Sequence, residues 1–146
     1  MSKYSDRAIE LFMDGKNCSQ AVFAAFAPDL GLSEEMALSI SIGLGGGVGR
    51  MREVCGAISG SAMVVGLKHP ELDKAEIYKL VRLIMEEFKK TNHSIVCKEL
   101  LGLAEAEKSS VPEARTPEYY QKRPCVKIVE DAALATEKIL FVEVNK

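Results

Sequence analysis

The sequence lacks the features that would assign it to a membrane or a nucleic-acid-binding class. It has no run of about eighteen apolar residues, so membrane insertion is not expected, and residues 1–6 contain no apolar stretch of the kind a secretory signal needs. The 19 basic and 21 acidic residues are spread along the chain and leave a net charge of -2, so no basic stripe can neutralise nucleic-acid phosphates. We therefore expect a cytoplasmic protein whose thiols stay reduced unless they hold a metal or cycle between redox states.

Groups for acid–base or nucleotide chemistry are also scarce. The only histidines are His69, before a proline at an expected helix end, and His93, beside an expected helix N-cap, and we interpret both as surface residues. The acidic residues are scattered, so no carboxylate pair stands out for acid–base catalysis. A G-x-G-x-x-G motif is absent because its third glycine would fall on Val48 or Arg50, and no G-K-[ST] follows. These absences leave the cysteines as the main candidates for chemistry.

Four cysteines are present, and no two of them form a C-x-x-C pair. The residues before them favour helix N-termini: Asn17 before the first, a glycine-rich stretch before the second, Ser94 as an N-cap three residues before the third, and Pro124 before the fourth. Unpaired N–H groups and the positive end of the helix dipole at such a position favour thiolate, the form that binds metals. The sequence therefore predicts metal-binding or redox-active thiols at Cys18, Cys55, Cys97 and Cys125.

The spacing of apolar residues predicts an all-α fold. With 146 residues, 47% of them hydrophobic, the chain is long enough to bury one core, so we expect a single domain over residues 1–146. No segment alternates with a period of two over a useful length. We expect a bundle of about six helices. The expected elements are a helix that ends at Gly15, one from Asn17 to Pro28, one over 33–42, one from near Cys55 to 68–70, one over 73–90, one over 95–101, an irregular or partly helical excursion over 104–123, and a last helix over 125–140.

A glycine-rich segment precedes the helix that starts near Cys55. Residues 43–50 contain five of the eleven glycines, and a chain accepts their entropic cost only where a regular element is not required, so we expect a loop. One interpretation is a backbone nest for an anion, with Arg50 and Arg52 adding positive charge. We favour the interpretation that the glycines let two helices, or the backbone and a prosthetic group, approach each other closely.

Small residues continue past Cys55. Gly56 and Gly60 lie four residues apart, as do Ala57 and Ser61, so one face of this helix carries little side chain. A mid-helix glycine costs about 1 kcal/mol relative to alanine. Two of them next to a cysteine therefore indicate a steric demand, either a closely packed helix or a bulky group beside Cys55. On the second interpretation, Gly56, Ala57 and Gly60 are candidate cofactor-binding residues.

Single cysteines at positions 18, 97 and 125 around the motif Cys55-Gly56-Ala57-Ile58-Ser59-Gly60 resemble the C_GCAxxG_C_C family, which is described as redox-active and has four characteristic cysteines. The resemblance covers nearly the whole chain, although the family label writes Gly before Cys where this sequence has the reverse order. The family is in turn similar to the N-terminal part of the split-Soret cytochromes c, to which a two-iron, two-sulfur cluster is assigned. The C-x-x-C-H haem motif of those proteins is absent here. The resemblance implies that the four cysteines converge on one redox site.

Three functions stay open for such a site. The first is a 2Fe–2S cluster or another metal held by Cys18, Cys55, Cys97 and Cys125 for electron transfer or redox sensing; zinc fits less well because structural zinc sites use closely spaced cysteine pairs. The second is a thiol–disulfide oxidoreductase that uses a converging cysteine pair. The third is a metal-free binding module that uses the glycine-rich segment, with the cysteines as small buried apolar residues. Redox function implies a redox partner, and the apolar helix faces are consistent with a homodimer.

Overall fold

The computed structural model describes residues 2–102, 109–122 and 124–141. Within these ranges the chain is helical and contains no named strand; the β-type pairing there is an isolated antiparallel bridge between Val54 and Val96. The predicted all-α fold is confirmed. No helix in the described part of the chain is both long and apolar enough to cross a membrane.

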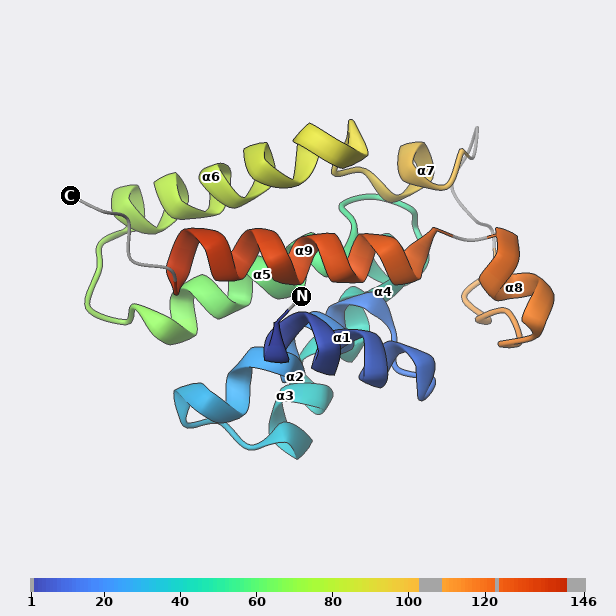
Figure 1. Cartoon of the computed structure of the whole chain (residues 1–146), viewed down its shortest axis with the longest axis horizontal. Coiled ribbons are helices and arrows are strands. Elements are labelled where there is room, and N and C mark those ends of the chain that lie inside the picture. The colour runs from blue at the N-terminus through green and yellow to red at the C-terminus, as the bar shows by residue number, and fades with distance from the viewer. Residues whose placement is uncertain (1, 103–108, 123, 142–146) are drawn as a thin grey trace.

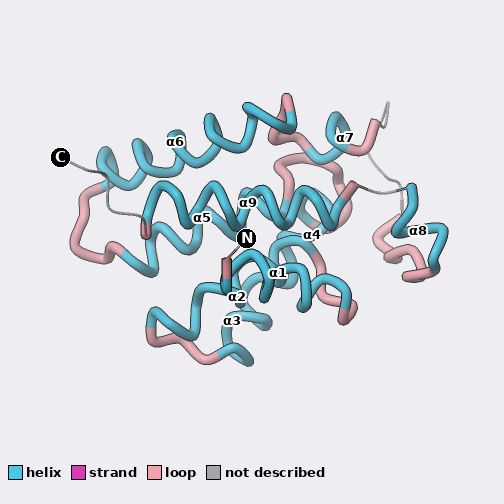
Figure 2. Tube along the Cα trace, in the orientation of Figure 1, coloured by secondary structure: helices cyan, strands magenta, loops and turns pink. Residues whose placement is uncertain are grey.

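Six longer helices make up the bundle over the described ranges, and short helical turns lie between them (Figure 1, Figure 2). The longer helices are α1 (Lys3–Met13), α2 (Cys18–Phe26), α3 (Glu34–Ser41), α5 (Gly56–Lys68), α6 (Lys74–Asn92) and α9 (Cys125–Leu140). The short elements are η1 (Ala27–Leu30), η2 (Ile42–Leu44), α4 (Gly45–Val48), α7 (Cys97–Leu100) and α8 (Pro117–Lys122). Figure 1 shows α9 lying lengthwise between α6 and α1.

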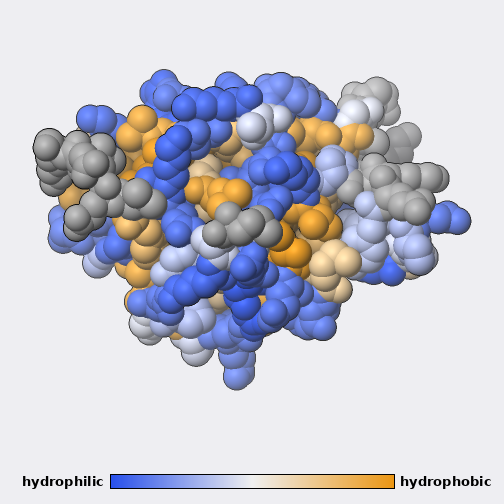
Figure 3. Space-filling view, viewed as in Figure 1, coloured by the Kyte–Doolittle hydropathy of each residue, from blue (hydrophilic) through white to orange (hydrophobic). Residues whose placement is uncertain are grey.

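The hydrophobic core lies where α2, α5 and α9 meet, with α1 and α6 packed against α9. Its largest fully buried side chains are Phe12, Phe26, Phe88, Ile58 and Ile84. A buried hydrogen bond from Thr136 Oγ1 to Ser61 Oγ, 2.7 Å long, ties α9 to α5. The face in Figure 3 is mostly hydrophilic, and apolar residues show there in patches between the helices. The bundle thus brings the N-terminal ends of helices from distant parts of the sequence to one region.

Close packing of α5 against α2 explains two of the glycines. A Cβ atom at Gly60 would lie 2.9 Å from the carbonyl oxygen of Ser19, and one at Gly56 would lie 3.0 Å from that of Leu44 and 3.1 Å from Ser19 N. The contact at Gly60 is too short for a methyl group without movement of the backbone, and the two at Gly56 are tighter than ordinary van der Waals contact. Of the two expectations for this small-residue face, the closely packed helix is confirmed.

The glycine-rich segment folds into η2 and a left-handed turn rather than an open loop. Five consecutive residues have positive φ angles between 58° and 72°: Gly46, Gly47, Val48, Gly49 and Arg50. A left-handed backbone costs a non-glycine residue about 1–2 kcal/mol, so three glycines keep that cost low and Val48 and Arg50 bear it. Glycine destabilises a right-handed helix but readily adopts a left-handed backbone. The prediction of a loop took only the first of these two properties into account.

Local capping signals gave the helix starts correctly in three places. The side chains of Asn17, Ser33 and Asp73 each accept a hydrogen bond from a backbone N–H in the first turn of α2, α3 and α6. The prediction that Ser94 caps a helix over 95–101 is wrong. Helix α7 begins at Cys97 with Val96 as its N-cap, because residues 95 and 96 pair with the chain around Val54 instead.

The expected excursion over 104–123 contains helix α8 in its described part, which fits a partly helical segment. Residues 103–108 and 123 of that prediction lie outside the described residues. The last helix ends at Leu140, with Phe141 as its C-cap, so residues 139 and 140 extend α9 as helix. Residue 142 lies outside the described part.

A cavity lined by four cysteines

Each cysteine stands at the beginning of a helix, as predicted. Cys18, Cys97 and Cys125 are the first residues of α2, α7 and α9, and Cys55 is the N-cap of α5. The thiols therefore lie in or next to the first turns of four helices, where backbone N–H groups are not used by the helix itself. The four helices come from separate parts of the sequence, so their starting points meet only because the bundle brings them together.

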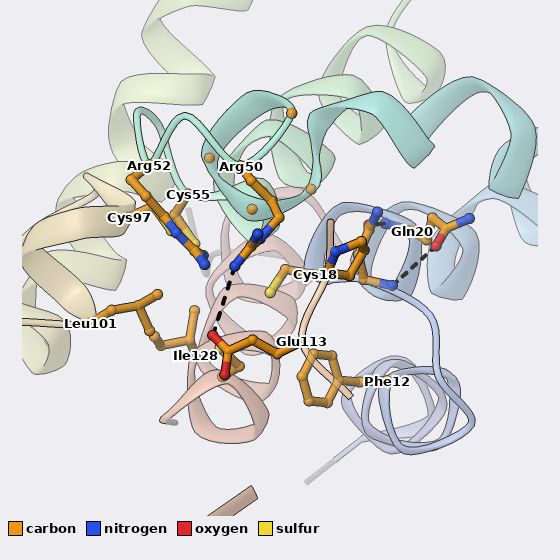
Figure 4. Close-up of a pocket in the computed structure, with 18 of the residues that line it drawn as sticks. Phe12, Cys18, Gln20, Arg50, Arg52, Cys55, Cys97, Leu101, Glu113 and Ile128 are labelled. Atoms are coloured by element: carbon orange, nitrogen blue, oxygen red, sulfur yellow. Dashed lines mark hydrogen bonds and ion pairs between the residues drawn. The ribbon is translucent and has the colours of Figure 1, made fainter. Parts of the chain in front are cut away.

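All four cysteines line one cavity of about 480 Å³. Cys55, Cys97 and Cys125 are buried, at 4%, 7% and 8% exposure, and Cys18 is partly exposed. None of the four forms a disulfide. Figure 4 shows the Cys18, Cys55 and Cys97 side chains extending toward the same space. The structure thus assembles one site from four thiols; the role of these residues as metal ligands stays a prediction.

The backbone fixes Cys55 and Cys97 relative to each other. Cys55 N donates to the carbonyl of Ile95 at 2.8 Å, and Cys97 N donates to that of Glu53 at 2.6 Å. These two bonds flank the Val54–Val96 bridge. The left-handed turn supports the same pair, because a Cβ at Gly47 would lie 2.7 Å from the Cβ of Cys97. The glycine-rich segment is therefore part of the wall of the site.

Cys18 and Cys125 form a second pair on the α2 and α9 side of the cavity. Their side chains are joined by a hydrogen bond, which is the main cause of a Cys18 pKa well above its ordinary value, followed by burial. The interaction brings together the first residue of the second helix and the first residue of the last. The cavity therefore contains two thiol pairs, one held by backbone pairing and one by direct contact.

Burial raises the pKa of the Cys55 thiol to about 12, although the backbone N–H groups of Ala57 and Ile58 act in the opposite direction. The expected stabilisation of thiolate by a helix N-terminus is present at this residue, but loss of solvent outweighs it. Burial therefore favours the neutral thiol over the thiolate at Cys55 and at Cys18 when nothing is bound. A metal ion would reverse this state, since a coordinating thiol loses its proton.

Arg52 brings a positive charge into the cavity. Its side chain lies beside Cys97, and Nη1 donates a hydrogen bond to the Cys97 sulfur at 3.6 Å (Figure 4). The residue is 6% exposed. Sequence reasoning had named Arg52 and Arg50 only as charges near a glycine nest. The contact of Arg52 with a cysteine from another segment depends on tertiary folding.

Arg50 binds a different segment of the cavity lining. Its guanidinium donates to the backbone carbonyls of Ser109, at 2.8 Å, and Val111, and lies 3.8 Å from the carboxylate of Glu113. Residues 109–120, here called the wall segment, contribute Ser110, Pro112, Glu113, Arg115 and Tyr119 to the cavity lining. Arg50 therefore connects the left-handed turn to a segment far from it in sequence.

Arg115 fastens the wall segment to α1. Its guanidinium donates to the carbonyls of Phe12 at 3.0 Å and Lys16 at 2.9 Å, and its carbon atom lies 4.2 Å from the centre of the Phe12 ring. Both carbonyls lie at or just past the C-terminal end of α1, where helix carbonyls lack helical partners. Sequence analysis did not single out this residue, because a lone arginine in a polar stretch carries no local signal of its contacts.

The other sequence-derived candidates take different places. Gly56 lines the cavity, whereas Ala57 is fully buried and Gly60 packs against α2, both outside the lining. Cofactor binding by Gly56, Ala57 and Gly60 stays a prediction. His69 and His93 lie outside the cavity, and His69 contacts the exposed Glu71 instead.

Several backbone N–H groups in and just after the left-handed turn already donate hydrogen bonds within it. Those of Gly49, Arg50, Arg52 and Glu53 donate to carbonyls within residues 43–47. An anion would have to break these bonds to reach the same donors. Of the two interpretations of this segment, close approach is confirmed by the spacing around Gly47 and Gly56.

The number of thiols matches the ligand set of a binuclear iron–sulfur cluster. Across the described ranges, no group of three or more His, Cys, Asp and Glu side chains is arranged to hold one metal ion. Four thiolates are nevertheless the complete ligand set of a binuclear iron–sulfur cluster, in which each iron takes two of them. The cavity volume also lies in the range of cofactor sites, about 300–1,000 Å³.

Fold and site together define an all-α protein in which four helix starts gather four thiols in one cavity. A family model described as "Putative redox-active protein (C_GCAxxG_C_C)" matches residues 16–139, a span that includes all four cysteines. The chain belongs to this family. No curated protein and no solved structure matches the chain.

Proposed function

We propose that Cys18, Cys55, Cys97 and Cys125 bind a 2Fe–2S cluster and that the protein transfers electrons or senses redox state through it. The observation that carries the proposal is the convergence of four thiols from four helix starts on one cavity. Such a cluster supplies one-electron redox chemistry when bound. The chain supplies the thiolate ligands, a largely buried setting, and positive charge around it.

The pairing of the thiols supports a binuclear group. Cys55 and Cys97 are held by the bridge between residues 54 and 96, and Cys18 contacts Cys125 directly. A binuclear cluster needs two thiolates at each of two irons, so two pairs match its symmetry. A single zinc ion needs all four sulfurs around one point, and structural zinc sites usually draw them from closely spaced cysteine pairs, which this sequence lacks.

The electrostatics of the cavity favour an anionic group. The N-terminal ends of α2, α5 and α9 point partial positive charge toward the cysteines, and Arg52 adds a full charge. Four thiolates and two sulfides outweigh the charge of two irons, so the group is an anion in either redox state. Its N–H and guanidinium neighbours would also donate hydrogen bonds to sulfur, a known influence on cluster potential.

The test is purification under anaerobic conditions with iron supplied, followed by iron and sulfide analysis and absorption spectroscopy. We expect about two irons and two sulfides per chain and visible bands that dithionite bleaches. Each of the four Cys→Ser variants should lower cluster content, whereas Met51→Leu, which alters an exposed sulfur side chain outside the cavity, should not. A colourless, metal-free protein with four titratable thiols overturns the proposal, and a stoichiometric zinc content without colour does so as well.

The Cys18–Cys125 contact supports a second candidate, a thiol–disulfide oxidoreductase. In that reaction the two thiols would lose two protons and two electrons to form one disulfide, while a substrate disulfide gains them and becomes two thiols. The raised pKa of Cys18 weighs against it, because thiolate is the nucleophile in such exchange. Trapping would decide: a mixed disulfide between Cys18 and a model disulfide in a Cys125→Ser variant supports this candidate over the cluster.

A further inference from the structure

The buried guanidinium of Arg52 contacts a cysteine sulfur in the cavity. Its Nη1 donates to Cys97 Sγ at 3.6 Å, and the residue is almost inaccessible to solvent. In Figure 4 the Arg52 side chain runs alongside Cys97. A charge that is shielded from water acts on its neighbours more strongly than a surface charge does.

The backbone holds Arg52 in this position from both sides. Its N–H donates to the carbonyl of Gly46 at 3.1 Å, and its carbonyl accepts from Lys98 N at 3.1 Å. One bond joins it to the left-handed turn and the other to the residue that follows Cys97. These two hydrogen bonds hold the backbone of Arg52 beside the start of α7, so the side chain begins close to Cys97.

We infer that Arg52 is a positioning residue that sets the reduction potential of the group bound by the four cysteines, by holding Cys97 and stabilising the added negative charge of the reduced form. The inference rests on the proposed function. Reduction by one electron makes the bound group more negative, so a nearby positive charge stabilises the reduced state more than the oxidised state. Loss of Arg52 should then lower the reduction potential.

Arg50 is engaged with the wall segment rather than with a cysteine sulfur in the contacts described above. Its guanidinium is paired with the carboxylate of Glu113 and donates to two wall-segment carbonyls, so a neighbouring negative group already offsets its charge. The two arginines therefore contact different parts of the cavity. Arg50 holds the wall segment, and Arg52 acts on the sulfur ligands.

The experiment compares wild type, Arg52→Gln, Arg52→Lys and Arg82→Gln after anaerobic reconstitution with iron and sulfide. Glutamine keeps a hydrogen-bond donor and removes the charge, and lysine keeps the charge. Arg82 is exposed on α6 and gives the same change in net charge away from the cavity. Iron content, absorption spectrum and midpoint potential are measured for each, with thermal melting as the control for folding.

We expect Arg52→Gln to lower the ratio of reduced to oxidised protein at least tenfold at a fixed potential, which is a shift of about 59 mV for a one-electron couple. Arg52→Lys should recover more than half of this shift, and Arg82→Gln should leave the potential unchanged. A cluster-loaded Arg52→Gln with the wild-type potential overturns the inference and leaves the proposed function intact. Failure of the wild type to take up iron and sulfide overturns both.

Retention of the cluster gives a second readout if Arg52→Gln cannot be measured. A cluster that persists in Arg52→Lys but not in Arg52→Gln supports the role of the charge. If neither variant holds the cluster while both melt as the wild type does, Arg52 is required for assembly and the inference about the potential is overturned.

Discussion

Gly47 packs its backbone directly against Cys97. A Cβ atom at Gly47 would lie 2.7 Å from the Cβ of Cys97 and 2.7 Å from the Cα of Arg52, and the residue has a φ of 72°. The absence of a side chain at this point lets the left-handed turn approach the start of α7. The position of one sulfur therefore depends on a glycine that lies far from it in sequence.

We predict that Gly47→Ala destabilises the metal-free protein by about 2–5 kcal/mol. A left-handed alanine costs about 1–2 kcal/mol, and forcing packed atoms apart costs about 1–3 kcal/mol more. Urea unfolding followed by circular dichroism measures the change. The effect should appear as a lower midpoint with an unaltered slope.

Gly66→Ala is the matched control for this substitution. Gly66 lies in α5, is exposed, and has no atom within 4 Å of an added Cβ. Alanine should stabilise the helix there by about 0.5–1 kcal/mol. Equal effects of the two substitutions would contradict the packing account of Gly47.

We predict that Gly60→Ala loosens the contact between α5 and α2. Alanine gains about 1 kcal/mol in helix propensity, but its Cβ would lie 2.9 Å from the Ser19 carbonyl oxygen, and relief of that contact costs about 1–3 kcal/mol. Because Cys18 begins α2, the movement should also lower iron content after reconstitution. Both unfolding and iron analysis test this, and a stabilising effect like that of Gly66→Ala would rule it out.

The stability of the metal-free, reduced protein should fall as pH rises above about 9. The ordinary pKa of cysteine is 9.0 and that of Cys55 in the fold is about 12, so between these values the unfolded chain releases a proton that the folded chain keeps. The unfolded state then binds fewer protons, and the free energy of unfolding falls by about 1.4 kcal/mol per pH unit for this thiol. Urea unfolding at pH 8, 9 and 10 measures the slope.

Cys55→Ser serves as the reference for the pH experiment, because other groups, Tyr4 among them, titrate in the same range. Serine does not ionise there, so the difference in slope between wild type and variant isolates Cys55. Parallel slopes would show that the buried thiol does not carry the effect.

Local signals were sufficient to predict the helix starts that carry three of the cysteines. Asn17 and Pro124 directly precede α2 and α9, and the glycine-rich segment ends shortly before α5. The start of α7 was misplaced because the backbone of residues 95 and 96 pairs with the chain around Val54. Pairing of this kind depends on residues far away in sequence, and neither caps nor periodicity report it.

The cavity itself required the tertiary structure. The family resemblance implied that the four thiols converge. It did not indicate that Cys18 pairs with Cys125 or that Arg52 lies beside Cys97, because both contacts follow from how α2, α5 and α9 pack. The left-handed turn was missed because glycine is usually taken as a helix breaker. Three of its five residues with positive φ angles are glycines, which adopt a left-handed backbone at little cost.

Arg115 should control how easily the wall segment opens. Hydrogen bonds from a charged donor contribute about 1.5–3 kcal/mol. Arg115→Ala removes the two that reach the carbonyls of Phe12 and Lys16, together with the contact over the Phe12 ring. We predict at least tenfold faster amide hydrogen exchange in residues 109–120 and faster alkylation of the cavity cysteines by iodoacetamide. Arg115→Lys should restore only part of the protection, because an ammonium group lacks the planar fork that reaches both carbonyls.

Arg82→Ala on exposed α6 is the control and should change neither rate. Faster alkylation without faster exchange in residues 109–120 would mean that iodoacetamide reaches the cysteines by another route.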